Sequence, residues 1–219
     1  MKEKRELDEV VLRMVEDLFT QPELKDVRTI GVVSDPNQGK TNLLNHLVDI
    51  FQKRAKDTKL VSFKMPKREG VYDIHSIAEL EMIHDSVVFM DEWADLIDLG
   101  NKRQAKEFEK TIRTIYHNNN IIILCGMARN FNGRVAGMMH AFIFKTTTLA
   151  DVVQRSTIHN ILQQYNGGFQ VKKGSAMLVM PKEVALVKII GGRFDEVTIP
   201  YVKWGDTKLN NAPIVKWDK

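Results

Sequence analysis

Cysteine is nearly absent from this sequence of 219 residues. The single one, Cys125, lies in an apolar run. A disulfide within the chain is therefore excluded, and the reducing cytosol is the expected environment. Long hydrophobic runs are missing as well, because no stretch approaches the ~20 consecutive apolar residues of a membrane-spanning helix. The charged segment 1–9 lacks the apolar centre of a secretory signal. These absences together predict a cytoplasmic protein without a membrane span.

An excess of charge of one sign is also missing. The 32 lysines and arginines exceed the 28 aspartates and glutamates only slightly, which leaves a net charge of +4. Such a mild basic excess is compatible with a polyanionic partner but does not require one. Apolar residues make up 43% of the chain and charged residues 27%, which is ordinary for a globular domain and excludes a disordered chain.

Apolar segments alternate along the chain with amphipathic ones. Strands are predicted at 28–33, 60–65, 86–90, 121–125 and 141–145. Helices are predicted at 10–19, 41–55, 74–83 and 103–116. The strand segments are apolar throughout, as is typical of a sheet covered on both faces. Strands that alternate with helices indicate an α/β fold with a mostly parallel central sheet flanked by helices.

Three parts of the chain differ in character. Residues 1–24 are predicted to form an N-terminal helix that stops at Gln21 and Pro22, and residues 25–165 form the α/β core. Residues 166–219 contain glycine- and proline-punctuated β-like runs, such as 177–180 and 184–190. We expect these runs to form a β-rich, antiparallel C-terminal extension of the same domain.

The segment 34–41 reads Ser-Asp-Pro-Asn-Gln-Gly-Lys-Thr and lies between a predicted strand and a predicted helix. The phosphate-loop pattern is G-x-x-x-x-G-K-[ST] in this context. Backbone N–H groups and the helix N-terminus form an anion site. Lys40 would reach the β- and γ-phosphates, and the Thr41 hydroxyl would hold Mg²⁺. The predicted nucleotide contacts are Ser34, Asp35, Pro36, Asn37, Gln38, Gly39, Lys40, Thr41 and Asn42.

The loop departs from the pattern at one position. Ser34 stands where the first glycine is usual, and Gly31 lies three residues too early to replace it. Serine is small, and its hydroxyl could donate to a phosphate. The alternative is an accidental Gly-Lys-Thr at a strand–helix turn.

An acidic pair follows the apolar run 87–90. The strand would deliver Asp91 to its C-terminal tip, where ligands bind in open α/β sheets. Asp91 would hold Mg²⁺ through water, and Glu92 would act as the general base that activates the attacking water. The alternative is a cap of a helix that begins near Trp93. The phosphate loop and the acidic pair together predict one nucleoside triphosphate site.

The nucleobase is predicted from the absence of a guanine-recognition motif. Guanine recognition needs Asn-Lys-x-Asp, whereas the nearest match, residues 101–104, lacks the aspartate and follows no strand. ATP with Mg²⁺ is therefore the expected ligand, and Glu92 predicts its hydrolysis.

With these motifs and the strand 121–125, the chain resembles the additional-strand ATPases with a catalytic glutamate. Within them it resembles the FtsK–HerA superfamily, in particular small viral genome-packaging ATPases and mobile-element DNA translocases. The segments 90–95 and 121–129 carry this resemblance, which covers roughly residues 29–141. It implies a strand 121–125 placed between the two nucleotide-binding strands. It also implies a motor that moves double-stranded DNA as a homo-oligomeric ring, such as a hexamer, in the cytoplasm of a host cell, with a capsid or portal protein as a further partner.

The resemblance also implies two further site roles. The strand 121–125 would lead to a sensor residue that faces the γ-phosphate, often glutamine, but Ala128 stands there, so Asn130 or Arg129 would take this part. A neighbouring subunit would supply an arginine that stabilises the developing charge. Arg129 and Arg134 are favoured over Arg155 for this role. The alternative for each is an ordinary surface arginine.

Basic residues gather in two further places. Lys67 and Arg68 lie in a loop after the second strand and are predicted DNA contacts. The helix 103–116 and the residue before it carry Lys102, Arg103, Lys106, Lys110 and Arg113. Contacts from these side chains to phosphates would be independent of base sequence and sensitive to salt. The alternative is a solvated helix surface, partly neutralised by Glu107 and Glu109.

Two other functions compete with DNA translocation. One is an ATPase that energises the assembly of a virion or secretion complex. The other is a small-molecule phosphotransferase, which Glu92 disfavours because such enzymes usually lack a second carboxylate at this position.

Overall fold

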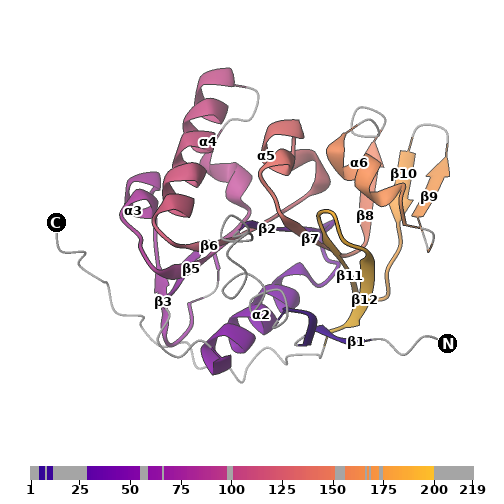
Figure 1. Cartoon of the computed structure of the whole chain (residues 1–219), viewed down its shortest axis with the longest axis horizontal. Coiled ribbons are helices and arrows are strands. Elements are labelled where there is room, and N and C mark those ends of the chain that lie inside the picture. The colour runs from indigo at the N-terminus through magenta and orange to yellow at the C-terminus, as the bar shows by residue number, and fades with distance from the viewer. Residues whose placement is uncertain are drawn as a thin grey trace.

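A computed structural model describes residues 5–7, 9–11, 29–54, 59–65, 67–97, 101–150, 156–165, 167, 169–172 and 175–199. Its main element is a nine-stranded sheet with the strand order β1-β12-β11-β7-β2-β6-β5-β3-β4 (Figure 1). The strands are β1 (Arg5–Glu6), β2 (Thr29–Val33), β3 (Lys59–Phe63), β4 (Val71–Asp73), β5 (Ser86–Asp91), β6 (Ile121–Gly126), β7 (Ala141–Phe144), β11 (Val184–Ile189) and β12 (Phe194–Thr198).

Six neighbouring strands of this sheet, from β7 to β4, run parallel to one another. β6 lies between β2 and β5, as the resemblance implied. The strands β2, β5, β6 and β7 are buried along their whole length, which accounts for their unbroken apolar sequences. The predicted α/β fold with a mostly parallel sheet is therefore confirmed.

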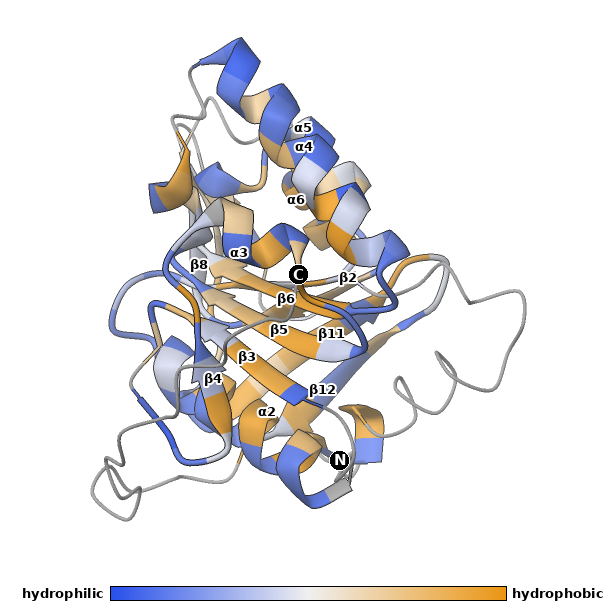
Figure 2. Cartoon of the chain, turned by 90° about the vertical axis from the view of Figure 1, so that its left-hand side faces the viewer, coloured by the Kyte–Doolittle hydropathy of each residue, from blue (hydrophilic) through white to orange (hydrophobic). Residues whose placement is uncertain are grey.

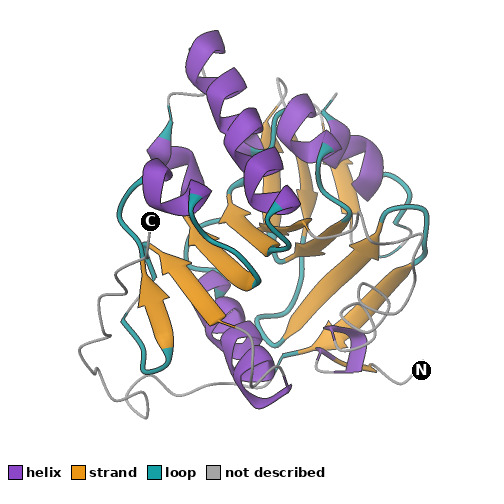
Figure 3. Ribbon diagram, turned by 60° about the vertical axis from the view of Figure 1, so that its left-hand side comes forward, coloured by secondary structure: helices purple, strands orange, loops and turns teal. Residues whose placement is uncertain are grey.

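Helices cover both faces of the sheet (Figures 1 and 3). The α-helices that follow β2 in the chain are α2 (Lys40–Arg54), α3 (Ile77–Glu81), α4 (Lys102–His117), α5 (Gly133–Gly137) and α6 (Thr157–Leu162). One apolar core joins α2 to one face, and a second core joins α3, α4, α5 and α6 to the other. Apolar residues line the strands between the layers, whereas the outward side of α4 is hydrophilic (Figure 2).

The sequence pattern of α2 and α4 explains how they dock. In α2 the residues predicted to face inward are all buried, namely Leu43, Leu44, Leu47, Val48 and Phe51. In α4 the buried residues include Phe108, Ile112 and Ile115. Both helices thus present one apolar stripe to the sheet and leave the other side to solvent.

The two ends of the chain differ in part from the predictions. Leu7 and residues 9–11 are helical, while residues 12–24 of the predicted N-terminal helix lie outside the described part. Arg5 and Glu6 are an exception to the helix prediction, because they form β1 and pair in parallel with β12. Local periodicity could not show this pairing, because an edge strand is held by a partner that is remote in sequence.

The β-rich segment near the C-terminus joins the core directly. β11 pairs antiparallel with β7 and with β12, so both strands extend the main sheet. A second sheet has the order β8-β10-β9, formed by Thr147–Ala150, Ser175–Leu178 and Phe169–Lys172. The antiparallel pairing agrees with the predicted extension, and the division at residue 166 stays a prediction. The strands β4 and β8 were not predicted, because each is short.

None of the helices in the described ranges combines the length and the apolar character needed to cross a bilayer.

Candidate functional site: a nucleotide site at three strand ends

Three adjacent strand ends form the candidate site. The loop 34–39 leaves the end of β2, Gly126 ends β6, and Asp91 ends β5. The Ser34 N–H donates to the Gly126 carbonyl over 3.1 Å, which ties the loop to the central strand. Because parallel strands end at the same edge of the sheet, the topology brings the phosphate loop and the acidic pair together.

The backbone of the loop has the shape of an anion site. Asn37 and Gly39 have positive φ angles of 60° and 82°. An added Cβ at Gly39 would be strained at this angle, which is why glycine suits the position. α2 begins at Lys40 and has no acidic residue in its first turn. Its free N–H groups and dipole therefore favour an anion such as a phosphate.

Lys40 lies between the two carboxylates. Its Nζ donates to the Glu92 carboxylate and lies 3.4 Å from Asp91 Oδ1. The side chains of Lys40 and Asp91 are only 11% and 10% exposed, so solvent screens their attraction weakly. Burial acts against the charged form of Lys40, but the bond to Glu92 and the nearby carboxylates raise its pKa. Burial raises the pKa of Asp91 more than Lys40 lowers it.

Glu92 occupies a left-handed conformation with φ 45° and ψ 42°. This conformation is uncommon outside glycine, costs on the order of 1–3 kcal/mol, and clusters at functional sites. The turn directs the Glu92 N–H to Asp91 Oδ1 over 3.0 Å and leaves the Glu92 side chain 40% exposed. Glu92 precedes a short 3-10 helix (Trp93–Leu96), yet its side chain makes no capping bond. The capping alternative is therefore not what the structure shows.

The start of the loop is anchored by residues that the sequence did not single out. The Asp35 carboxylate accepts bonds from the Thr148 N–H over 3.0 Å and from its hydroxyl over 2.7 Å. The Asp35 N–H donates to the Thr146 carbonyl over 2.9 Å. The Ser34 hydroxyl donates to the Asp35 carbonyl over 2.9 Å. In this arrangement the side chains of Ser34 and Asp35 stabilise the loop. Their contacts to a phosphate stay predictions.

A buried lysine connects the loop to the C-terminal part of the chain. Lys145 is 1% exposed, and its Nζ donates to the carbonyl of Val184 over 2.8 Å and to those of Pro181 and Lys182. Its Cε would lie 3.9 Å from a Cβ placed on Gly39. Burial lowers the pKa of Lys145 to about 8. A lysine after an apolar strand carries no recognisable signal for this role, so the sequence could not reveal it.

The predicted sensor and arginine residues follow β6. Asn130 ends a short 3-10 turn (Ala128–Asn130) and is buried. Its Nδ2 would lie 3.0 Å from a Cβ on Gly126, which places it at the end of the strand between β2 and β5. Arg129 is exposed, and Arg134 Nε lies 3.8 Å from Glu109 Oε1. The roles of these residues stay predictions, and Arg155 lies outside the described residues.

The two predicted DNA contacts in the loop after β3 differ in their accessibility. Lys67 is exposed. Arg68 instead forms an ion pair with Asp49 and donates to the Asn45 carbonyl over 3.0 Å, so it fixes the loop to α2. Burial lowers the pKa of Arg68. A contact from Arg68 to DNA would require this ion pair to open, whereas Lys67 is accessible.

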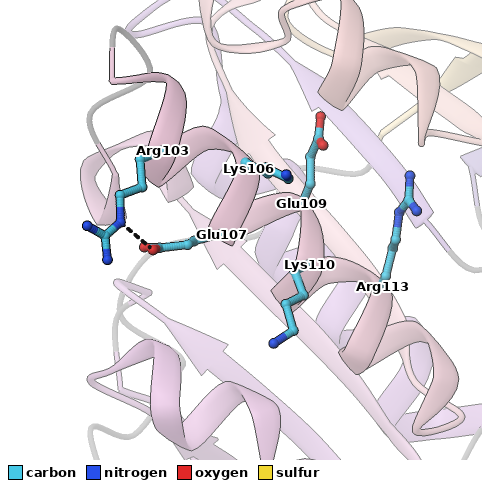
Figure 4. Close-up of a pocket in the computed structure, with 6 residues that line it drawn as sticks. All are labelled: Arg103, Lys106, Glu107, Glu109, Lys110 and Arg113. Carbon is cyan, nitrogen blue, oxygen red and sulfur yellow. Dashed lines mark hydrogen bonds and ion pairs between the residues drawn. The ribbon is translucent and has the colours of Figure 1, made fainter.

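The exposed side of α4 carries a depression of about 540 Å³ (Figure 4). Its lining residues are Arg103, Lys106, Glu107, Glu109, Lys110 and Arg113. Three of these charges have partners in the chain: Arg103 Nε lies 3.1 Å from Glu107 Oε1, and Glu109 pairs with Arg134. Within the described residues the other three cations, Lys106, Lys110 and Arg113, have no ion-pair partner. We call these three residues the α4 ridge.

The fold is similar to those of solved ATPase structures. The genome-packaging NTPase B204 from Sulfolobus turreted icosahedral virus 2, in complex with ATP-gammaS, superposes with a TM-score of 0.55 at 10% identity, over 80% of this chain and 99% of that one. The DNA-packaging ATPase B204 from Sulfolobus turreted icosahedral virus gives a TM-score of 0.54 at 10% identity, over 80% and 98%. The cytoplasmic domain of the type VII secretion ATPase EccC from Thermomonospora curvata gives 0.55 at 9% identity, over 81% and 26%.

These likenesses establish the fold. At 9–10% identity they show that the chain shares the fold of these ATPases, which agrees with the fold that the resemblance implied. The chain spans about the full length of B204 but only 26% of the EccC domain. No protein-family model matches the sequence, and no curated protein matches it.

Proposed function

We propose that this chain is an ATPase that uses Mg²⁺ and couples ATP hydrolysis to the movement of double-stranded DNA, as in genome packaging. One observation carries the proposal: Lys40, at the start of α2, is bonded to Glu92 and lies 3.4 Å from Asp91. A lysine from the phosphate loop and two carboxylates from the neighbouring strand end thus share one site. These are the groups that bind a triphosphate and activate water against it.

Binding of the triphosphate would exchange the partners of Lys40. Its ammonium leaves the carboxylates and bonds to the β- and γ-phosphates, while the N–H groups of the loop and of the first turn of α2 hold the phosphate oxygens. The ammonium has anionic partners both before and after the nucleotide binds, so it is never an unpaired buried charge. The departure of Lys40 frees Glu92.

The donor set of the site suits Mg²⁺. The hydroxyl of Thr41 and the carboxylate of Asp91 are hard oxygen ligands, and Mg²⁺ sites at phosphates typically use one or two protein oxygens with water and phosphate completing the shell. When bound, the ion supplies positive charge next to the β- and γ-phosphates. Thr41 follows Lys40 in the first turn of α2, and Asp91 lies across the site at the end of β5.

Glu92 is placed to act on water. Its side chain is 40% exposed, in contrast to that of Asp91, and the left-handed turn carries it out of line with β5. Once free of Lys40, its carboxylate would accept a proton from a water that attacks the γ-phosphorus, while the bond from that phosphorus to the β–γ bridging oxygen breaks and ADP leaves. Asn130 would contact the γ-phosphate as the sensor. Arg129 or Arg134 of a neighbouring subunit in a ring would stabilise the charge that develops there.

DNA is the proposed polymer because the α4 ridge presents cations that have no ion-pair partner in the part of the chain that the structure describes. Lys106, Lys110 and Arg113 are exposed on the side of α4 opposite its buried stripe. Cations of this kind bind the phosphate backbone without reading bases. The fold similarity to packaging ATPases whose chains are covered almost completely supports the same function. A capsid or portal protein would then be the stationary partner in the host cytoplasm.

An ATPase for secretion or virion assembly is the second candidate. The EccC domain, named as a type VII secretion ATPase, has as high a TM-score as B204, and the cytoplasmic domain of EssC gives 0.51 at 11% identity. In this case ATP turnover would respond to a protein partner rather than to DNA. A phosphotransferase is disfavoured, because Glu92 lies beside Lys40 where it would promote attack by water.

The rate of phosphate release with and without double-stranded DNA, across a series of salt concentrations, tests the proposal. We expect Mg²⁺-dependent turnover that DNA stimulates at low salt and that loses its stimulation as salt rises. Turnover without DNA stimulation, in protein shown to be oligomeric, would contradict the DNA motor and favour the second candidate. An absence of both ATP binding and turnover would contradict the ATPase itself.

A further inference from the structure

The indole N–H of Trp93 is a buried hydrogen-bond donor that lacks an acceptor among the described residues. The Trp93 side chain is fully buried, and its Nε1 has no hydrogen-bond partner among the residues that the structure describes. The large majority of buried polar groups are paired, so an unpaired one in a native structure needs a specific explanation. Trp93 directly follows Glu92, the proposed general base, which places this donor beside the nucleotide site.

The unpaired N–H faces the end of the central strand. A Cβ on Gly126 would lie 3.3 Å from Trp93 Nε1 and 3.0 Å from Asn130 Nδ2. The indole nitrogen and the amide nitrogen of Asn130 therefore border the same point beside Gly126, which has no side chain to separate them. In the orientation observed, the amide presents its N–H₂ group on this side, so two donors face the same space. A half-turn of the amide would present its carbonyl oxygen there instead.

The indole ring itself is held firmly. It stacks on Phe108 of α4 with ring centres 5.0 Å apart and an angle of 9° between the planes. It also meets Phe131 edge to face at 5.7 Å and 68°. An aromatic ring fixed on both sides presents its N–H in one direction. The Asn130 amide, which ends a short turn, is the partner that can rotate.

We propose that Trp93 is a positioning residue for the γ-phosphate sensor. When a nucleoside triphosphate occupies the loop, the Asn130 amide turns, its Oδ1 accepts the indole N–H, and its N–H₂ group is directed toward the γ-phosphate. One rotation satisfies both donors, whereas the opposite orientation would leave the indole N–H unpaired and present an oxygen to the phosphate. This inference rests on the proposed ATPase function and on Asn130 as its sensor.

A substitution that removes the N–H but keeps an aromatic ring tests the inference. Trp93→Phe keeps an aromatic ring between Phe108 and Phe131 but has no donor. We expect kcat at saturating ATP to fall about tenfold, the loss that corresponds to one hydrogen bond made in the reactive complex. KM should stay within about twofold, because the amide acts on the γ-phosphate late in the reaction. Without ligand, the Tm should not fall on account of the missing N–H, because that donor is unpaired there.

A matched control separates positioning from packing. Ile115→Ala removes a buried side chain of the same apolar core, about two helical turns along α4 from Phe108, and leaves Trp93 and its ring contacts in place. This control should lower the Tm while kcat stays within about twofold. Gly126→Ala is a second variant, because its methyl group would occupy the space in which the amide turns. We expect it to lower kcat as Trp93→Phe does.

The indole resonance gives a direct readout. In a ¹H–¹⁵N spectrum the Trp93 Nε1–H signal is assigned by its absence from Trp93→Phe, and it should move downfield when ATPγS and Mg²⁺ are added. A signal that does not move in protein shown by calorimetry to be saturated would overturn the inference. So would an unchanged kcat in Trp93→Phe, or a fall in kcat no larger than that of the packing control at a comparable fall in Tm. If the wild-type protein fails to bind ATPγS, the proposed function fails as well, so the two failures are distinguishable.

Discussion

Two charged regions of this molecule differ in how their charges are paired. At the strand ends, Lys40 is almost buried and engages both Asp91 and Glu92. On the outside of α4, Lys106, Lys110 and Arg113 are exposed and have no ion-pair partner within the described residues. Each charge at the strand ends therefore depends on the others, whereas the charges of the α4 ridge act independently.

This difference in pairing and burial determines how strongly solvent and salt screen each charge. Buried ion pairs are screened weakly, so removal of one partner leaves an uncompensated charge and has a large effect. Exposed cations are screened by salt over ~10 Å at 0.1 M, so each adds a small, additive contribution to binding of a polyanion. Substitutions in the two regions should therefore differ in size and in salt dependence.

Removal of the lysine at the strand ends should have the largest effect. Lys40→Ala deletes the cation that the triphosphate needs and leaves Asp91 and Glu92 repelling both each other and the phosphates. We expect the affinity for ATP to fall on the order of 100-fold or more, measured by calorimetry. Lys64→Ala is the matched control, because Lys64 pairs with Asp95 near the surface and is 45% exposed. Unchanged ATP affinity and turnover in Lys40→Ala would remove the basis of the nucleotide site.

Neutralisation of the proposed base should affect the rate rather than binding. Glu92→Gln keeps the size of the side chain but cannot accept a proton. We expect kcat to fall about 10²–10⁴-fold, the range typical of general bases, with ATP affinity retained. Single-turnover phosphate release measures the chemical step. Glu107→Gln, at an exposed glutamate of α4, serves as the control, and near-normal turnover in Glu92→Gln would falsify the assignment of the base.

Removal of ridge cations should have a smaller effect that depends on salt. Lys106→Ala combined with Lys110→Ala should weaken DNA binding and lower the slope of log affinity against log salt by about one for each DNA phosphate that is no longer neutralised. ATP turnover without DNA should not change. Lys53→Ala combined with Lys59→Ala removes the same charge elsewhere on the surface. An equal decrease of DNA affinity in the two double variants would show that only the net charge matters.

Titration of Lys145 concerns the stability of the fold rather than binding or turnover. Its pKa of about 8 in the folded state lies below the ordinary value of 10.5. Between these pH values the unfolded chain binds more protons than the folded one, so this residue makes stability rise with pH across the window, and the gain is lost as pH falls through 8. Urea unfolding from pH 7.5 to 10.5 measures it. Lys145→Met should remove this rise, and curves parallel to those of the wild type would contradict the assignment.

The phosphate loop and the acidic pair were visible in the sequence because each is short and contiguous. Lys40, Asp91 and Glu92 follow local patterns, and apolar runs before them identified the strands. The order β2-β6-β5 was implied by the resemblance rather than by any local pattern. The sequence could not show that Arg68 binds Asp49, or that Asp35 binds Thr148, since both partners lie far apart along the chain.

The sequence by itself determined the class of fold and identified the segment of the proposed phosphate loop and the residues available for chemistry, because these depend on periodicity and on short motifs. Only the tertiary structure decided which groups meet: the bonds of Lys40 to Glu92 and of Lys145 to the turn near Val184, and the placement of Trp93 and Asn130 beside Gly126. Such contacts arise from the pairing of distant strands and the packing of helices on them. Many partners are compatible with one local sequence, so these contacts are settled only when the whole chain folds.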